Sequence, residues 1–185
     1  LAWSSAASDV YKRQALDRVP GLRCVLGLFE GVVTGAADGY GRMRDFPSAT
    51  LLHTGPGLGN GLANLHNARK ARSPVVNIVG DHATYHIRHD APLTSDIEGI
   101  AAPVSDWVKT SRNAEDVSSD GAQAIAEARK TPGRIATLIL PADTAWNKAS
   151  SGATVLSVPN PETVNSNTLD ECVRVLRSGE PVMLL

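Results

Sequence analysis

Two apolar runs constrain the fold of this chain more than any other feature. The segments PVVNIVG (74–80) and RIATLIL (134–140) are apolar at most positions and lack the alternation of a half-exposed strand. Strands with this pattern are buried on both faces, as in parallel sheets that helices cover on each side. Helix-like segments separate the strand-like ones, so the sequence predicts a doubly wound α/β fold with a mainly parallel sheet.

The expected elements alternate from residue 15 onward. Strands are expected at 23–29, 48–53, 74–79, 107–110 and 134–140, and helices at 31–43, 60–71, 95–103 and 116–130. After these elements the chain becomes rich in Ser, Pro, Asn and Thr, which is typical of a linker. We therefore expect one domain over 15–146, a linker over 147–167, and the start of a second domain over 168–185, with a helix followed by a strand at PVMLL.

The first residues require separate treatment. Residues 4–14 read SSAASDVYKRQ, which is the in-frame translation of a transposon-end adapter used to prepare shotgun sequencing libraries. The alternative is a native tail rich in Ser and Ala. We interpret 1–14 as non-native and exclude it from fold reasoning. The natural sequence is then expected to start near Ala15 and to continue past residue 185.

Composition excludes several classes of partner. The formal net charge is −1, no cluster of Lys and Arg is present, and aromatic residues make up 4% of the chain, which argues against nucleic-acid binding. No apolar run approaches the roughly 20 residues of a membrane span, and no signal peptide opens the chain. The two cysteines, Cys24 on an expected buried strand and Cys172 on an expected helix, are interpreted as small hydrophobic residues. A cytoplasmic protein is expected.

Glu30 is the first candidate for chemistry. It stands where an expected strand gives way to a helix of small residues, with Leu28, Phe29 and Val32 as its expected walls. Desolvation at such a place raises the proton affinity of a carboxylate, which suits proton transfer to a cofactor. The alternative is a structural carboxylate at a helix N-terminus, where the macrodipole stabilises it by about 0.3–1 kcal/mol.

The helix after Glu30 is unusually rich in glycine. Gly31, Gly35, Gly39 and Gly41 fall within eleven positions, and each glycine costs about 1 kcal/mol of helix stability relative to alanine. A helix tolerates this composition where something approaches it closely. A neighbouring sheet, a partner helix or a flat cofactor ring would each explain the pattern.

The segment HTGPGLGNG (53–61) is the next candidate. Its spacing matches neither the dinucleotide-binding fingerprint nor a P-loop. We expect a tight turn from strand to helix that brings backbone close to a ligand, with Asn60 capping the helix. His53 should lie beside Glu30, because the carboxyl ends of parallel strands share one edge of the sheet. The alternative for His53 is a hydrogen-bonded structural residue.

A group of histidines follows the third expected strand. His82, His86 and His89, with Asp81 and Asp90, have spacings that would suit a metal site on a helix. The segment follows a strand, however, and soon reaches a proline, so a solvent-facing loop without a metal is expected.

Four segments together carry a resemblance to a known family. They are FEGVVTGAADGYGRM (29–43), LLHTGPGLGNGLANLHNA (51–68), SPVVNIVGDH (73–82) and GRIATLILPAD (133–143). They resemble the pyrimidine-binding domain of thiamine diphosphate enzymes, in the group of acetolactate synthase, benzoylformate decarboxylase and pyruvate oxidase. The resemblance implies that the first strand and helix of the fold are missing here, and that 168–185 begins the family's central domain.

The resemblance also implies roles for individual residues. Glu30 takes the position of the glutamate that hydrogen-bonds the cofactor's aminopyrimidine and so promotes formation of the thiazolium ylid. Gly57 and Asn60 join Glu30 as candidate cofactor-binding residues. His53 matches the acid/base histidine of benzoylformate decarboxylases. Pro92 and Leu93 stand where acetolactate synthases carry a Phe-Gln pair, which favours decarboxylation of a 2-oxo acid, or a related carboligation, over acetolactate synthesis.

Part of the implied site lies elsewhere. This family holds the diphosphate and its magnesium ion with a Gly-Asp-Gly motif and a downstream asparagine, in a different domain of a second subunit. The sequence GDH (80–82) is not that motif, and the chain contains no other candidate for it. The expected partner is therefore a second subunit, in a homodimer or homotetramer, and the 185-residue chain alone should be inactive. The alternative is a non-catalytic α/β binding or assembly module; a nicotinamide- or flavin-binding domain is disfavoured by the missing fingerprint.

Overall fold

The fold is built on one parallel sheet. The computed structural model describes residues 14, 16, 18–44, 46–158 and 160–183. All three strand pairings among these residues are parallel, as the buried apolar runs predict. The spatial order is β1 (Ser48–His53), β2 (Val75–Asp81), β4 (Ile135–Pro141) and β3 (Trp107–Thr110).

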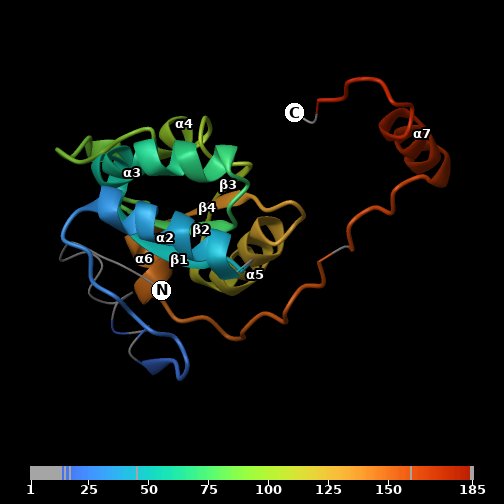
Figure 1. Cartoon of the computed structure of the whole chain (residues 1–185). Coiled ribbons are helices and arrows are strands. Elements are labelled where there is room, and N and C mark those ends of the chain that lie inside the picture. The colour runs from blue at the N-terminus through green and yellow to red at the C-terminus, as the bar shows by residue number, and fades with distance from the viewer. Residues whose placement is uncertain (1–13, 15, 17, 45, 159, 184–185) are drawn as a thin grey trace.

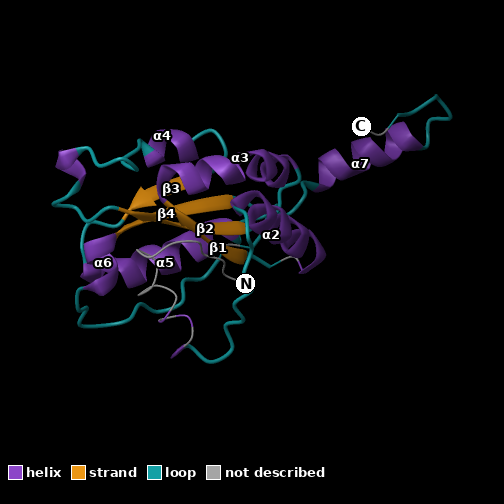
Figure 2. Cartoon of the chain, turned by 90° about the vertical axis from the view of Figure 1, so that its left-hand side faces the viewer, coloured by secondary structure: helices purple, strands orange, loops and turns teal. Residues whose placement is uncertain are grey.

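Helices cover both faces of the sheet, which confirms the doubly wound α/β fold (Figures 1 and 2). One face carries α2 (Glu30–Arg44), α3 (Thr54–Lys70) and the short α4 (Ile97–Ala101). The other face carries α5 (Ala114–Ala128) and α6 (Ala142–Trp146). In the part of the chain that the structure describes, no helix is both long enough and apolar enough to cross a membrane.

Alternate side chains of the strands enter two separate cores. Leu52, Val79 and Ile139 pack with apolar residues of α2, α3 and α4, and each is at most 2% exposed. Val76 and Leu138 point to the opposite face and pack against alanines of α5. Each fully buried side chain of this kind stabilises the fold by about 1.5–3 kcal/mol. The sheet is therefore held from both sides, and its carboxyl edge is a rigid support for the residues that follow the strands.

A row of polar side chains crosses the sheet inside the first core. Thr50 of β1 donates to the amide oxygen of Asn77 on β2 at 2.7 Å, and the amide nitrogen of Asn77 donates to Thr137 of β4 at 3.1 Å. The hydroxyls of Thr137 and Ser105 lie 2.7 Å apart. The three strand residues are 0% exposed, so this row satisfies polar groups that water cannot reach.

The prediction of a strand at 23–29 is wrong. The segment contains only a single bridge residue, Cys24, and does not join the four-stranded sheet. Val25 packs against the first core, but Leu26 and Leu28 are exposed. Apolar composition favours a strand only when a neighbouring strand offers a hydrogen-bonding edge, and the segment has no such neighbour among the described residues. The buried position expected for Cys24 is also wrong, because both Cys24 and Cys172 are exposed and free.

The glycine-rich segment after β1 is helix rather than a turn. Helix α3 begins at Thr54, six residues before the predicted start, and Pro56 is accommodated in its first turn, where a backbone N–H is not needed. Asn60 is consequently inside the helix and not its cap, and His53 occupies the N-cap position without a side-chain capping bond. A Cβ at Gly55 would overlap Ser95, so this glycine serves close packing of the helix.

Other boundaries differ less. Helix α4 is confined to Ile97–Ala101, shorter than the expected 95–103, and Asp96 caps it by accepting from the backbone N–H of Gly99. Helix α5 starts two residues before the expected position, where Asn113 caps it. A 3-10 helix (Ile87–His89) lies within the histidine segment, where a loop was expected.

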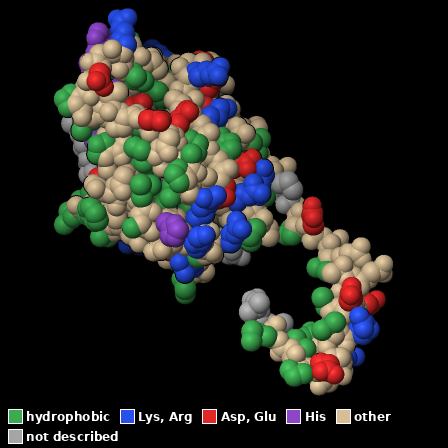
Figure 3. Space-filling view, turned by 90° about the horizontal axis from the view of Figure 1, so that it is seen from above, with side chains coloured by type: hydrophobic (Ala, Val, Ile, Leu, Met, Phe, Trp, Pro, Cys, Tyr) green, Lys and Arg blue, Asp and Glu red, His purple; other side chains and the backbone are tan. Residues whose placement is uncertain are grey.

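The C-terminal part of the chain lies apart from the sheet. Residues 147–158 and 160–165 contain no helix or strand, and α7 (Ser166–Leu176) follows them. Ser150 still donates to the carboxylate of Glu115 in α5, and Figures 1 and 3 show the later part of this segment extending away from the body of the molecule. Of the strand expected at PVMLL, residues 181–183 are neither helix nor strand, and the last two lie outside the described residues. Residues 1–13 of the segment interpreted as non-native are also outside them.

Asp38 connects α2 to the loop that follows α3. Its carboxylate accepts two hydrogen bonds of 2.8 Å from Arg42 and one of 2.5 Å from the hydroxyl of Ser73. Burial raises the pKa of Asp38, but the hydrogen bonds from Arg42 and Ser73 outweigh it and bring the pKa below its ordinary value of 3.8.

The lowered pKa of Asp38 gives a testable dependence of stability on pH. Because the folded-state pKa is below the unfolded one, the stabilisation is present above about pH 4 and is lost as the pH falls through the folded-state pKa. Asp38→Asn should lower the free energy of unfolding at pH 7 and flatten its decline in acid, as measured by urea unfolding at several pH values. The exposed Asp170→Asn should change neither. An unaltered acid decline in Asp38→Asn would contradict this account.

Candidate active site

Glu30 is the first residue of α2, and its carboxylate meets α3. The amide nitrogen of Asn60 donates to Oε2 of Glu30 at 3.2 Å. A carboxylate at a helix N-terminus is also stabilised by the helix dipole. The side chain of Asn60 therefore orients the carboxylate that the sequence singled out, a role different from the capping function predicted for it.

Gly57 lies between Glu30 and His53. A Cβ on Gly57 would be 3.4 Å from Oε1 of Glu30 and 3.7 Å from Cβ of His53. Any larger side chain would thus fill the space beside the second carboxylate oxygen. The structure brings together all four residues that the sequence proposed for the site, although they come from β1, α2 and α3.

His53 is the last residue of β1 and pairs with Gly80 of β2. The next residue, Thr54, has a φ of 53° and donates from its hydroxyl to the carbonyl of His53 at 2.8 Å. A β-branched residue at positive φ is an outlier that costs about 1–3 kcal/mol, and such strain concentrates at functional sites. The sharp change of direction at Thr54 lets the strand end at His53 while the helix starts at once.

Helices α2 and α3 are held close together beneath the site. The hydroxyl of Thr34 donates to the carbonyl of Gly61 at 3.1 Å, and Asn64 donates to the carbonyl of Gly31 at 2.6 Å. A Cβ on Gly61 would come within 2.7 Å of Thr34, and one on Gly35 within 3.1 Å of Asn64. Of the three explanations left open for the glycines of α2, close approach of a partner helix holds for Gly35, whereas Gly41 lies against Pro74 next to β2. The contact between α2 and α3 fixes Glu30 relative to Asn60.

The apolar side chains that were expected to cover Glu30 do not bury it within this chain. Leu28 is 94% exposed, and Phe29 and Val32 are more than half exposed. Glu30 itself is half-buried. The three apolar side chains lie on the outside because α2 begins at Glu30 and turns them away from the core. Any desolvation of Glu30 by these residues would require a further surface to cover them.

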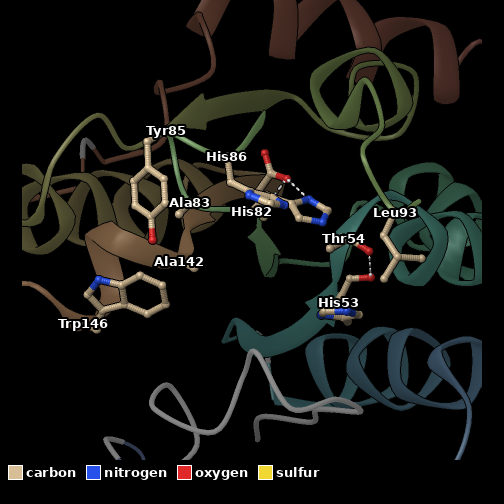
Figure 4. A pocket seen from close by; sticks show the side chains of 10 residues that line it. His53, Thr54, His82, Ala83, Tyr85, His86, Leu93, Ala142 and Trp146 are labelled. Atoms are coloured by element: carbon tan, nitrogen blue, oxygen red, sulfur yellow. Dashed lines mark hydrogen bonds and ion pairs between the residues drawn. The ribbon is translucent and has the colours of Figure 1, made fainter. Parts of the chain in front are cut away.

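A cavity of about 490 Å³ opens next to His53 at the carboxyl ends of β1, β2 and β4 (Figure 4). Cavities of this size and place are typical of small-molecule sites in α/β folds. His53 and Thr54 form one side, and the segment after β2 and helix α6 form the rest. The lining residues are His53, Thr54, Asp81, His82, Ala83, Tyr85, His86, Leu93, Ala142 and Trp146.

The histidine segment does not face solvent as a whole. The side chain of His82 is only 18% exposed, and its ring stacks on that of His86 with centroids 5.8 Å apart. Nδ1 of His82 is buried without a hydrogen bond, and Oδ1 of Asp81 lies 3.5 Å from it. A buried polar atom left unpaired costs about 1–3 kcal/mol. The prediction of a solvent-facing loop is therefore wrong for His82, while His86 and His89 are exposed.

Asp143 holds the histidine segment against α6. Its carboxylate accepts from the backbone N–H of Thr84 at 2.9 Å and from the Thr84 hydroxyl at 2.6 Å. Burial raises the pKa of Asp143, but the hydrogen bonds from Thr84 and from its own helix outweigh it and lower the pKa. The connection keeps Tyr85 and Trp146 on the same side of the cavity.

Sequence reasoning missed Tyr85 and Trp146 as cavity residues. Both follow the carboxyl ends of central strands, β2 and β4, and that position was the signal available. Within the described ranges, no group of three or more His, Cys, Asp or Glu side chains is arranged to hold a metal ion.

The residues present fit the pyrimidine end of a thiamine cofactor. The carboxyl group of Glu30 could accept a hydrogen bond from a ring nitrogen when ionised, or donate one when protonated. Asn60 fixes one of its oxygens, and the absence of a side chain at Gly57 leaves space beside the other. These features fit the pyrimidine ring of the cofactor. The described residues offer no comparable metal-ligand set for a magnesium diphosphate.

Comparison with known proteins agrees with this geometry. Residues 7–100 match the family model of the N-terminal TPP binding domain of thiamine pyrophosphate enzymes. IlvX of Mycobacterium tuberculosis (strain ATCC 25618 / H37Rv), provisionally named as an acetolactate synthase large subunit, is 53% identical over 178 residues. That alignment covers 96% of this chain and 34% of the relative.

Two further relatives carry the name of a decarboxylase. Benzoylformate decarboxylase of Pseudomonas aeruginosa (strain PAO1) is 32% identical over 172 residues, which cover 88% of this chain and 32% of the relative. The structure of the thiamine diphosphate-dependent 4-hydroxybenzoylformate decarboxylase of Rhodococcus jostii RHA1 superposes with a TM-score of 0.85 at 24% identity, covering 95% of this chain and 34% of that one.

The chain spans about a third of the length of the curated relatives it matches. The match to the family model covers half of the residues of this chain. The chain therefore belongs to the thiamine pyrophosphate enzymes and carries their N-terminal TPP binding domain.

Proposed function

We propose that this domain is the pyrimidine-binding part of an enzyme that uses thiamine diphosphate to decarboxylate a 2-oxo acid or to join the product to a second carbonyl. The single observation that carries the proposal is the cluster in which Asn60 binds Glu30 and Gly57 separates Glu30 from His53. The curated relatives named above support the same reaction class, since acetolactate synthase and benzoylformate decarboxylase are the names they carry.

Glu30 is proposed to hold a proton at the cofactor ring. Asn60 donates to Oε2, and Oε1 lies on the side of Gly57, where the ring of the cofactor is proposed to approach. A carboxylate fixed in this way positions the proton without a rearrangement of its own side chain, which is the condition for efficient proton transfer.

His53 is proposed to move protons on the substrate side. The bound cofactor would supply a carbon nucleophile that adds to the carbonyl carbon of the 2-oxo acid and accepts the electron pair left by departing carbon dioxide. His53 borders both the Glu30 cluster and the 490 Å³ cavity, so its side chain lies at the boundary where a substrate oxygen or carbon would exchange a proton.

Decarboxylation is favoured over acetolactate synthesis. Leu93, which stands where acetolactate synthases carry one residue of a Phe-Gln pair, lines the cavity. A leucine there offers no hydrogen-bond donor or acceptor to a second substrate. A decarboxylase needs only to protonate the product, for which His53 suffices.

A second subunit is proposed to complete the site and to bring the diphosphate and magnesium. The support is the apolar surface around Glu30: Leu28, Phe29 and Val32 are exposed, as is Met43 on the same side of α2. Exposed apolar groups of this kind mark interaction surfaces. We accordingly propose a homodimer or homotetramer in the cytoplasm, and no turnover by the 185-residue chain on its own.

The His53→Ala variant of the full-length enzyme tests the proposal. Turnover of 2-oxo acids, measured as release of carbon dioxide in the presence of thiamine diphosphate and magnesium, should fall about a hundredfold, because the acid/base group is lost. His66→Ala, which removes an exposed imidazole of α3 outside the cavity, should leave turnover unchanged.

The competing candidate is a non-catalytic binding or assembly module of the same fold. Such a module would retain its ligand affinity in His53→Ala and would show no turnover in the wild type. Cofactor-dependent release of carbon dioxide by the wild type, lost in His53→Ala, excludes it.

A further inference from the structure

We propose that the cavity beside His53 is the substrate-specificity pocket, in which His82 binds the carboxylate of a 2-oxo acid and Tyr85 and Trp146 enclose a flat, bulky apolar substituent. The inference rests on the proposed function for the identity of the ligand as a 2-oxo acid. Apart from His53, which borders both, the pocket is built from residues outside the Glu30 cluster.

The cavity has a polar end and an apolar end. Figure 4 shows His53, Thr54 and Leu93 on one side, His82 and His86 in the middle, and Tyr85, Ala142 and Trp146 on the other side. A ligand whose reacting carbonyl lies near His53 would therefore have its carboxylate near the imidazoles. Its substituent would extend toward the aromatic pair.

His82 is the residue prepared to bind an anion. Its Nδ1 is covered and lies 3.5 Å from Oδ1 of Asp81, while other atoms of the side chain, which is 18% exposed, line the cavity. The same Asp81 oxygen accepts from the backbone N–H of His82 at 2.7 Å, and the ring is stacked on His86. A protonated His82 would donate from Nδ1 to Asp81 and from Nε2 to a ligand carboxylate, which places one cation between two anions.

The aromatic end of the cavity is formed by Tyr85 and Trp146, which are accessible to a ligand and lie on segments that are hydrogen-bonded to each other. Tyr85 is 61% and Trp146 46% exposed, although both line a concave surface. The hydrogen bonds from Thr84 to Asp143 connect the segment that carries Tyr85 to the helix that carries Trp146. Two aromatic side chains held this way favour a flat apolar group, which gains both buried area and ring contacts. The methyl group of pyruvate would leave this end of the cavity empty.

Ligand binding to the 185-residue chain tests the inference without cofactor or turnover. The probes are phenylglyoxylate, pyruvate, which lacks the ring, and acetophenone, which lacks the carboxylate. The readouts are the indole N–H signal of Trp146 and the imidazole signals of His82 in NMR titrations. Phenylglyoxylate should shift both sets of signals and bind at least about tenfold more tightly than either of the other two compounds.

Variants separate the two ends of the pocket. His82→Gln should weaken phenylglyoxylate about tenfold and leave acetophenone unchanged, while Trp146→Ala, followed through the His82 signals, should weaken both aromatic compounds. His66→Gln is the matched control and should change nothing. Thermal unfolding of each variant reports whether the fold is retained, and Tyr85→Phe, which keeps the ring, should bind like the wild type.

The inference would be overturned by equal affinity for the three compounds, by absence of the Trp146 shift, or by unchanged phenylglyoxylate binding in a folded His82→Gln variant. Failure of the proposed function has a different signature. In that case phenylglyoxylate would bind to the pocket as described, but the full-length enzyme would release no carbon dioxide with thiamine diphosphate and magnesium.

Discussion

Replacement of Glu30 by glutamine in the full-length enzyme should slow exchange of the thiazolium C2 proton of bound thiamine diphosphate by about a thousandfold. A glutamine keeps the size of the side chain and can still pair with Asn60 by rotating its amide. The glutamine amide cannot share a proton with a ring nitrogen. The fall in exchange rate therefore measures the proton-holding role of Glu30 separately from its role in packing. The measurement is hydrogen–deuterium exchange at C2, quenched in acid and read by NMR.

The control for Glu30→Gln is Glu162→Gln, an exposed position in the segment before α7. In this variant the thiazolium C2 proton should exchange at the wild-type rate. Cofactor affinity should be measured in parallel, so that slow exchange is not a consequence of an empty site. Exchange within a fewfold of wild type in a Glu30→Gln enzyme saturated with cofactor would refute the role of Glu30.

Gly133→Ala should lower the free energy of unfolding by at least about 4 kcal/mol, a loss seen only where a named structural conflict exists. Gly133 joins α5 to β4 with a φ of 118°, a conformation that side chains rarely adopt. A Cβ there would overlap the backbone carbonyl of Arg72, which has no flexible end that could move aside. The measurement is urea unfolding followed by circular dichroism, and a loss under about 1 kcal/mol would contradict the packing described.

Gly121→Ala is the matched control for the Gly133 experiment. Gly121 lies inside α5, at a φ usual for helix, and a Cβ there would meet no atom within 4 Å. The alanine should stabilise the domain by about 0.5–1 kcal/mol, because glycine in a helix interior is unfavourable. The two glycines thus predict opposite signs for the same chemical change.

The strands that carry the site were predictable from the sequence because their burial is visible in their composition. The segments 48–53, 74–79 and 134–140 were each placed to within a residue or two of their observed bounds. The sequence also predicted that Glu30 and His53 lie near each other, and Gly57 is next to both. The strand-end argument holds only for His53, because Glu30 starts a helix that no strand of the sheet precedes among the described residues.

The start of α3 was not predictable by the same reasoning. Four glycines and a proline within eight residues favour a turn on propensity alone, and tertiary packing overrides that preference here. The pattern becomes intelligible only with Thr34 and Glu30 in place, since these side chains occupy the space that Cβ atoms at Gly61 and Gly57 would crowd. Asn60 was accordingly given a capping role instead of its contact with Glu30.

The cavity was missed for a related reason. Tyr85 and Trp146 are separated by some sixty positions and meet through the contact of Thr84 with Asp143. Hydrophobic periodicity gives no information about such a contact. The prediction of a strand at 23–29 erred in the opposite way. The apolar residues of that segment suggested a buried strand, but several of them are exposed in this chain.

The polar row of Thr50, Asn77 and Thr137 determines where the strand ends fall. These residues are direct neighbours in the sheet, and each hydrogen bond in the row requires that exact alignment. If β2 slipped by one residue, Val76 or Ile78 would face Thr50, and the Asn77 amide would turn to the other face without its partners. The row therefore fixes the register of β1 against β2, and with it the position of His53 relative to Asp81 where both line the cavity.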